Sequence, residues 1–124
     1  MLTPNYVLLY VDSPEESGRF YSRLLGREPV EASPTFVLFV LETGLKLGLW
    51  SRHTVEPAAT AAGGGSEIGI GVESREAVEV LYREWKKLDV PFLQEPTELD
   101  FGRTFVGLDP DGHRLRVLFV DEPA

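Results

Sequence analysis

The 124-residue sequence contains no cysteine, which excludes disulfides, thiolate zinc sites, iron–sulfur clusters and cysteine nucleophiles. It has only two histidines, His53 and His113, so a metal site would have to depend mainly on carboxylates. No apolar run approaches the roughly 20 residues needed to span a bilayer, and no signal-peptide pattern opens the sequence. We therefore expect a soluble, cytoplasmic protein.

Positive charge is also scarce, with 12 basic against 20 acidic residues and a net charge of -8. The acids are spread along the chain, and such a surface repels phosphate backbones and anionic lipids. We therefore expect neither nucleic acid nor a membrane as a partner. Nucleophile elbows, phosphate-binding loops and dinucleotide motifs are missing as well, and the Gly63–Gly65 run lacks the lysine of a phosphate-binding loop.

An internal duplication is the most informative feature that is present. A shift of 61 positions, from 6 to 67, places the segment 6–13 over the segment 67–74. Both segments have the alternating pattern of a strand, and both end in an acid followed by serine. The same shift places Phe20-Tyr21 over Leu81-Tyr82. Each half is therefore predicted to begin with a strand that runs directly into a helix.

Helix boundaries can be read in both halves. In the first, Ser13 and Pro14 are typical of a helix start, with Glu16 completing a capping box, and Gly26 is typical of a helix end. In the second, Ser74 is the predicted N-cap, apolar residues recur at spacings of three and four, and Pro91 prevents continuation.

Three strands are predicted after each helix, so each half is a βαβββ module and the fold class is α+β. The predicted strands are 28–32, 35–41 and 45–51 in the first half, and 92–98, 103–108 and 113–120 in the second. We expect module one at about 1–55, a linker at about 56–65 and module two at about 66–124. The low-complexity run 57–65 is interpreted as a flexible linker, with a mobile lid as the alternative.

These patterns resemble the vicinal oxygen chelate superfamily, which includes glyoxalase I, bleomycin-resistance proteins and extradiol dioxygenases. The resemblance is carried by Val11-Asp12, Ser17, Phe20-Tyr21, Leu25-Gly26 and the turn Asp109-Pro110-Asp111-Gly112. It implies the glyoxalase/bleomycin-resistance fold over residues 1–124, in which the curved mixed sheets of two modules enclose a pocket, usually within a homodimer. Leu49-Trp50-Ser51, 66–70 and the segment 101–105 are more specifically similar to a phenazine-resistance branch, whose members act by binding the antibiotic.

The resemblance also shows which positions would hold a metal in catalytic members of the superfamily. Catalytic members hold a divalent metal through one residue on the first and one on the last strand of each module. The matching positions here are Tyr6 and Gly48 in module one, and Glu67 and Arg116 in module two. Only Glu67 is a plausible ligand, because glycine offers no side chain and a guanidinium cannot coordinate a cation. We therefore predict no metal, no cofactor and no catalytic residue.

Strand alternation predicts what lines the pocket instead. We expect flat aromatic walls, a glycine floor and an arginine–glutamate pair, with further residues closing one end. The predicted binding residues are Trp50, Arg116, Glu67, Tyr6, Tyr10, Gly48, Gly69, Phe101, Arg103 and Phe105.

Aromatic walls favour a small planar aromatic ligand, plausibly a phenazine-like antibiotic sequestered without metal. Two alternatives stay open: an enzyme of the same superfamily, metal-dependent or metal-independent, of the lyase, isomerase or dioxygenase type, and a regulatory or dimerisation module with a vestigial pocket.

Overall fold

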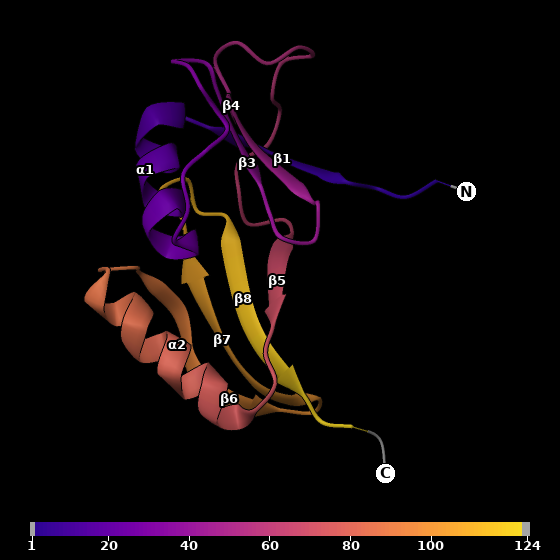
Figure 1. The fold of residues 1–124 in the computed structure, drawn as a ribbon, viewed down its shortest axis with the longest axis vertical. Coiled ribbons are helices and arrows are strands. Elements are labelled where there is room, and N and C mark those ends of the chain that lie inside the picture. Colours follow the sequence, from indigo (N-terminus) through magenta and orange to yellow (C-terminus); the bar gives the residue numbers. More distant parts are fainter. Residues whose placement is uncertain (1, 123–124) are drawn as a thin grey trace. The chain divides into compact units, whose positions relative to one another are not determined.

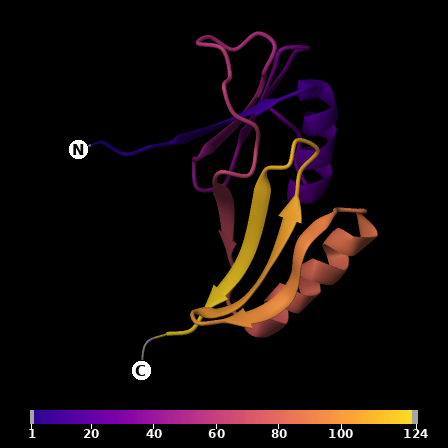
Figure 2. The same ribbon diagram turned by 180° about the vertical axis from the view of Figure 1, so that it is seen from behind.

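A computed structural model describes residues 2–122, and the chain divides into two compact units, Met1–Ala62 and Gly63–Ala124. The division falls inside the predicted linker. Each unit is a four-stranded mixed sheet with one helix packed on one face, as Figure 1 and the reverse view in Figure 2 show. The α+β class and the βαβββ order of each module are thereby confirmed.

The first unit is built from one helix and four strands in the spatial order β1-β4-β3-β2. Its β1 and β4 are parallel, whereas β4 with β3 and β3 with β2 are antiparallel. The elements are β1 (Tyr6–Val11), α1 (Pro14–Leu25), β2 (Glu31–Ala32), β3 (Phe36–Val40) and β4 (Lys46–Ser51).

The second unit repeats this topology in the order β5-β8-β7-β6, with β5 and β8 parallel. Its β8, β7 and β6 are antiparallel to one another, and β6 is irregular in its pairing. The elements are β5 (Glu67–Gly71), α2 (Arg75–Lys87), β6 (Phe92–Leu99), β7 (Gly102–Leu108) and β8 (Arg114–Val120).

Both helices begin where the sequence predicts. Ser13 Oγ accepts a hydrogen bond from the Glu16 N–H at 3.2 Å, and Ser74 Oγ accepts one from the Ala77 N–H at 3.0 Å. Helix α1 ends at Gly26 in the left-handed conformation with φ 64°, which glycine adopts without steric cost. These caps fix the point at which each helix turns back over its sheet.

The core of each unit lies between the helix and one face of its sheet. In the first unit, Val37, Phe39 and Leu49 are almost fully buried beneath α1. In the second, Phe105 packs edge-on against Trp85 of α2, with ring centroids 5.1 Å apart. Within residues 2–122, the structure has no helix that is both long and apolar enough to cross a membrane.

The observed strand ends differ from the predicted ones by no more than one residue, with one exception. The first strand after α1 is predicted at 28–32, but β2 contains only Glu31 and Ala32. Pro29 has no N–H to donate to a ladder, and the chain is held instead by a bond from the Val30 N–H to the Leu38 carbonyl at 2.8 Å.

Candidate functional site

Each sheet has one face that does not carry the helix, and we call this the helix-free face. Burial along β1, β3, β5 and β8 and the pairing of β4 and β7 with their neighbours place the even-numbered side chains of β1, β3, β4, β7 and β8 on it, together with the odd-numbered side chains of β5. In the first unit it carries Tyr6, Leu8, Tyr10, Phe36, Leu38, Val40, Lys46, Gly48 and Trp50. In the second it carries Glu67, Gly69, Gly71, Thr104, Val106, Arg114, Arg116 and Leu118.

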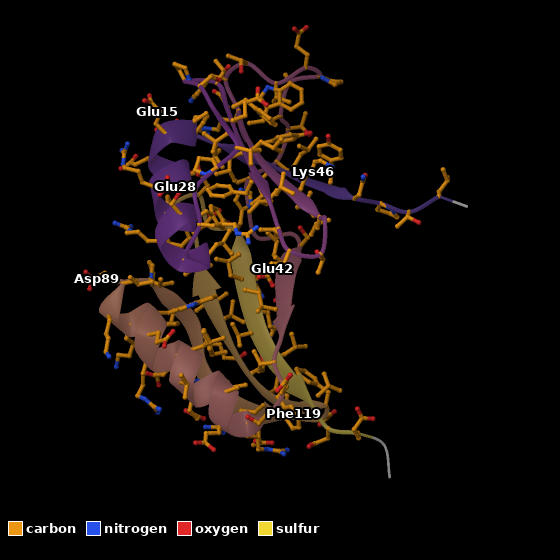
Figure 3. The ribbon with its side chains drawn as sticks, in the orientation of Figure 1. Glu15, Glu28, Glu42, Lys46, Asp89 and Phe119 are labelled. Atoms are coloured by element: carbon orange, nitrogen blue, oxygen red, sulfur yellow. The ribbon has the colours of Figure 1, made fainter. Side chains whose placement is uncertain are left out.

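Aromatic rings dominate the helix-free face of the first unit. Trp50 meets Phe36 edge-on, with ring centroids 6.1 Å apart, and it lies directly across from Tyr10 on the parallel strand β1. Tyr6 and Tyr10 are 52% and 41% exposed, so their rings are accessible. Lys46, labelled in Figure 3, places its Nζ 5.1 Å from the Tyr6 ring centroid. Trp50, Tyr6 and Tyr10 therefore share one face, as predicted.

Gly48 lies on this face but does not form an open floor. A Cβ at this position would lie 2.7 Å from Leu8 Cδ2 and 2.9 Å from Phe36 Cζ. The missing side chain is thus replaced by two apolar side chains of the same unit. Gly48 therefore lies on the same face as Trp50, with the space above it filled by Leu8 and Phe36.

A bidentate ion pair between Arg116 and Glu67 lies on the helix-free face of the second unit. Arg116 Nε donates to Glu67 Oε1 at 2.7 Å, and Arg116 Nη2 donates to Glu67 Oε2 at 2.8 Å. Arg116 Nη1 donates to Gln94 Oε1 and to Thr104 Oγ1, both at 3.2 Å. Thr104 in turn donates to the Val117 carbonyl at 2.8 Å. The Arg116 side chain is therefore held in one orientation by β5, β6 and β7 together.

The ion pair is charged at neutral pH. The hydrogen bonds from Arg116 hold the pKa of the Glu67 carboxyl below its ordinary value, against the opposing effect of partial burial. The same bonds raise the pKa of the Arg116 guanidinium. Arg114 adds a second cation, with its Nη1 3.6 Å from Glu67 Oε2. One carboxylate is thus shared between two arginines, which leaves a net positive charge on this face.

Two glycines leave room beside this cluster. A Cβ added at Gly69 would find one atom within 4 Å, Leu118 Cδ2 at 3.8 Å, and a Cβ at Gly71 would find none. Gly69 lies directly across from Arg116, and Gly71 directly across from Leu118. Within its unit, this part of β5 is therefore a bare strip of backbone next to the arginines.

Three predicted binding residues lie elsewhere. Phe105 is fully buried against α2, and Arg103 pairs with Glu79 of α2 at 2.7 Å, so both lie on the helix side of the sheet. Phe101 lies in the turn between β6 and β7, where its carbonyl accepts the Asp121 N–H. Within the second unit, Arg103 and Phe105 therefore lie on the opposite face of the sheet from Arg116, because β7 presents its odd-numbered side chains to α2.

Sequence reasoning missed Gln94 and Thr104, both of which hold Arg116. Thr104 has a recognisable signal. The turn at 109–112 sets β7 against β8 so that Thr104 faces Leu118 and Val106 faces Arg116. Residues directly opposite in an antiparallel pair share a face, so the turn alone places Thr104 beside Arg116. No comparable signal exists for Gln94, because β6 pairs with β7 through register shifts.

Each histidine lies near the end of a strand in its own unit. His53 follows β4, and its Nε2 lies 2.7 Å from Asp12 Oδ1 at the end of β1. The hydrogen bonds from His53 and Arg52 lower the pKa of the Asp12 carboxyl. His113 borders the last turn, where its N–H donates to Asp109 Oδ1. Both lie beyond a strand end or beside a turn, as predicted.

The residues that the family resemblance matches to metal positions do not fit a cation. Both oxygens of Glu67 are engaged by Arg116, whose own charge opposes a metal ion. Gly48 offers no donor atom. Across residues 2–122, the structure brings together no group of three or more histidine, aspartate or glutamate side chains that could hold a metal. We therefore derive no chemistry through a metal.

The first unit also has a groove of about 530 Å³ on its helix side. It runs between α1 and the segment 28–37, and its lining mixes apolar residues with Arg19 and Arg23. Glu15 and Glu28, which also line it, are labelled on the α1 side of the unit in Figure 3. The two acids balance the two arginines, so the charge of the lining favours neither anionic nor cationic ligands. We assign no ligand to this groove.

The chain is similar to proteins of known name and structure. It is 38% identical over 123 residues to the phenazine antibiotic resistance protein EhpR of Enterobacter agglomerans, covering 97% of this chain and 94% of that protein. It is 52% identical to a protein of Agrobacterium tumefaciens solved by solution NMR, with a TM-score of 0.90 over 98% of this chain and all of that one.

A glyoxalase-related enzyme from Fulvimarina pelagi shares the fold, with a TM-score of 0.84 over 96% of this chain and 88% of that chain, at 21% identity. The model of the glyoxalase/bleomycin resistance protein/dioxygenase superfamily matches residues 3–117. With this match and the two βαβββ units, the chain belongs to the glyoxalase/bleomycin resistance protein/dioxygenase superfamily.

Proposed function

We propose that this protein binds a small planar aromatic compound of the phenazine type without a metal, and confers resistance by sequestering it. The observation that supports the proposal is the ion pair between Glu67 and Arg116, the two residues of module two that the family resemblance matches to metal-binding positions. The 38% identity to a phenazine antibiotic resistance protein supports the ligand class. The homodimer implied by the family resemblance and the cytoplasmic location expected from the sequence are part of the same proposal.

The helix-free face of the first unit supports binding by stacking. Trp50, Tyr6 and Tyr10 present accessible ring surface on two adjacent strands. Offset stacking on such rings is worth about 0.5–1.5 kcal/mol per pair beyond the area that is buried. Trp50 is anchored by its edge-on contact with Phe36, so its orientation is set before a ligand arrives.

The polar groups of the second unit favour a ligand-binding function over a metal-dependent catalytic one. A metal-dependent lyase, isomerase or dioxygenase needs a Lewis acid to stabilise an enediolate or to activate oxygen. Here Glu67 is neutralised by an arginine, and Arg116 is fixed by Gln94 and Thr104. Such a fixed cation can recognise a polar substituent on a ligand but cannot act as a proton donor at neutral pH.

The test is a calorimetric titration with phenazine-1-carboxylate, repeated on Trp50→Leu. We expect saturable binding by the parent protein and an affinity lower by about threefold to tenfold for the variant, from the loss of one stacking pair. Trp85→Phe is the matched control, because Trp85 is 3% exposed in the core of the second unit. It is expected to keep the parent affinity.

Tryptophan fluorescence then locates the ligand. Quenching is expected to persist in Trp85→Phe and to fall sharply in Trp50→Leu. If Trp50→Leu binds as tightly as the parent protein, the stacking surface is wrong. If no planar aromatic compound binds saturably, the function itself is wrong, and a regulatory or dimerisation module becomes the better interpretation.

A further inference from the structure

Gly48 is buried on the helix-free face of the first unit, although its neighbours on that face are not. Along β4, Lys46 and Trp50 are half-buried, whereas Gly48 between them is buried. Side chains from both neighbouring strands cover it. A Cβ at this position would lie 2.7 Å from Cδ2 of Leu8 on β1, and 2.9 Å and 3.0 Å from Cζ and Cε1 of Phe36 on β3. The volume that a side chain would need at position 48 is therefore taken by Leu8 and Phe36.

The register of the sheet shows that Phe36 reaches Gly48 diagonally. Phe36 lies directly across from Trp50, whereas the residue directly across from Gly48 is Leu38. Diagonal neighbours of an antiparallel pair are roughly 7–8 Å apart, so the tip of the Phe36 ring reaches Gly48 only by lying along the sheet. In this position the ring meets the indole of Trp50 edge-on, with centroids 6.1 Å apart and planes at 84°. One phenyl ring thus contacts both the glycine and the tryptophan.

We propose that Gly48 and Phe36 are positioning residues for the ligand. Gly48 leaves the space in which the Phe36 ring lies, and this ring holds the indole of Trp50 in the orientation that stacks on the ligand. The inference rests on the proposed function and deepens it, because it identifies what fixes the stacking residue. Gly48 acts through Phe36, and Phe36 acts through Trp50, all within the sheet of the first unit.

A methyl group at position 48 would displace Phe36 without preventing the strand from forming. The backbone of Gly48 does not have a positive φ, so alanine fits its conformation. Leu8 is 43% exposed, and its flexible end can turn away from the added group. The ring of Phe36 is rigid and has only two torsions, so it must move as a whole, either toward Trp50 or away from the sheet. Either movement changes its edge-on contact with the indole.

A fixed indole binds a flat ligand more tightly than a mobile one. A side chain that is free before binding must be ordered when the ligand arrives, which lowers the affinity by about twofold to tenfold. Trp50 is half-buried, so its own burial does not hold it in a single orientation. The contact with Phe36 supplies this order in advance, and Gly48 makes the contact possible.

The first experiment observes Trp50 without a ligand. The sequence has two tryptophans, so in Trp85→Phe the tryptophan band of the near-UV circular dichroism spectrum comes from Trp50 alone. We expect this band to fall by about half or more when Gly48→Ala or Phe36→Leu is added, because the signal requires fixed packing. Phe39→Leu is the matched control, since Phe39 is fully buried on the opposite face of β3. It is expected to lower the stability but not the band.

The second experiment measures the affinity for phenazine-1-carboxylate in a double-mutant cycle. Gly48→Ala is expected to lower the affinity of the parent protein by about twofold to tenfold, and by no more than Trp50→Leu does. In Trp50→Leu the same substitution is expected to change the affinity by less than about 1.5-fold, because no indole is left to position. Thermal unfolding of each variant shows that it is folded, and Phe36→Leu replaces Gly48→Ala in the cycle if the latter does not fold.

The outcomes separate this inference from the proposed function. If Gly48→Ala leaves the tryptophan band or the affinity unchanged, the positioning role is overturned and the binding function stands. Equal weakening of the parent protein and of Trp50→Leu also overturns it, because position 48 then acts on the ligand without Trp50. If the parent protein binds no planar aromatic compound, the proposed function fails, whereas the band still decides whether Gly48 and Phe36 hold Trp50.

Discussion

Glycine has three different roles in this protein, and the space around each residue distinguishes them. Gly102 has φ 145°, and a Cβ there would lie 2.0 Å from the Phe119 carbonyl oxygen. Gly48 makes room for Leu8 and Phe36, and Gly69 faces open space. All three residues are glycine in the sequence, so the sequence alone does not show whether the backbone at each position is strained, tightly packed or exposed.

Alanine at Gly102 and at Gly69 should therefore have opposite consequences for stability. We expect Gly102→Ala to lower the free energy of unfolding by more than about 2 kcal/mol, because the backbone conformation is strained and the added Cβ strikes a carbonyl. Gly69→Ala should change it by less than about 0.5 kcal/mol. Urea unfolding followed by circular dichroism measures both, and equal destabilisation by the two variants would contradict the contacts on which this contrast rests.

Arg103 and Phe105 lie on the helix side of β7 for a simple physical reason. Arg114 and Arg116 share a face of β8. The turn that joins β7 to β8 pairs even-numbered with even-numbered residues, so the odd-numbered residues of β7 lie on the opposite face from these arginines. Of the similar segment 101–105, Gly102 and Phe105 serve the packing of the unit, so similarity there indicates fold more directly than ligand contact.

At the scale of single elements, the two helices were predictable because their signals are local. Serine caps, a proline at the first position and a glycine at the end act within one turn of the chain. The length of β2 and the irregular pairing of β6 were not, because Pro29 interrupts the first and register shifts against β7 interrupt the second. Gln94 contacts Arg116 from this irregular strand, so strand alternation alone does not predict the contact.

Helix α2 is tied to two strands at its first residue. Arg75 Nε donates to Glu98 Oε1 of β6 at 2.8 Å, and its Nη2 donates to Asp121 Oδ2 beyond β8 at 2.7 Å. Its guanidinium also lies 5.4 Å from the ring centroid of Phe119, which Figure 3 labels near the end of β8. One residue thus links the start of the helix to the ends of β6 and β8.

The contribution of Arg75 should depend on pH in a defined direction. Its hydrogen bonds hold the pKa values of Glu98 and Asp121 below their ordinary values, so the folded state binds these protons less readily than the unfolded state. The contribution is complete above the ordinary pKa values of about 4 and is lost as the pH falls through the lowered values. Arg75→Gln should therefore be less stable than the parent protein at pH 7, and the difference should shrink toward pH 2.

Urea midpoints of both proteins across this range provide the measurement. Arg83→Gln, which removes an exposed arginine from the same helix, controls for the loss of charge alone. A difference between Arg75→Gln and the parent protein that stays constant from pH 7 to pH 2 would show that the carboxylates are not responsible.

At the scale of the whole molecule, the two units repeat one topology with different chemistry. In the first, Leu8 of β1 lies across from Gly48 of β4, so the glycine is on the last strand. In the second, Gly69 of β5 lies across from Arg116 of β8, so the glycine is on the first strand. The duplication predicted the fold of both units, but the small and large residues exchange places between the first and the last strand, so the two helix-free faces differ in their surface.

The same comparison predicts how the protein responds to divalent metals. Of the four positions that hold the metal in catalytic members of the superfamily, only Glu67 has a carboxylate, and Arg116 engages both of its oxygens. We expect elemental analysis of protein purified without chelator to find substoichiometric zinc, nickel, manganese and iron. Added metal should not raise the melting temperature, because a ligand stabilises a fold only in proportion to its affinity for it. Stoichiometric metal in the parent protein that is lost in Glu67→Gln would contradict the predicted absence of a metal and restore the enzymatic interpretation. Metal that is retained in Glu67→Gln would lie at a different site.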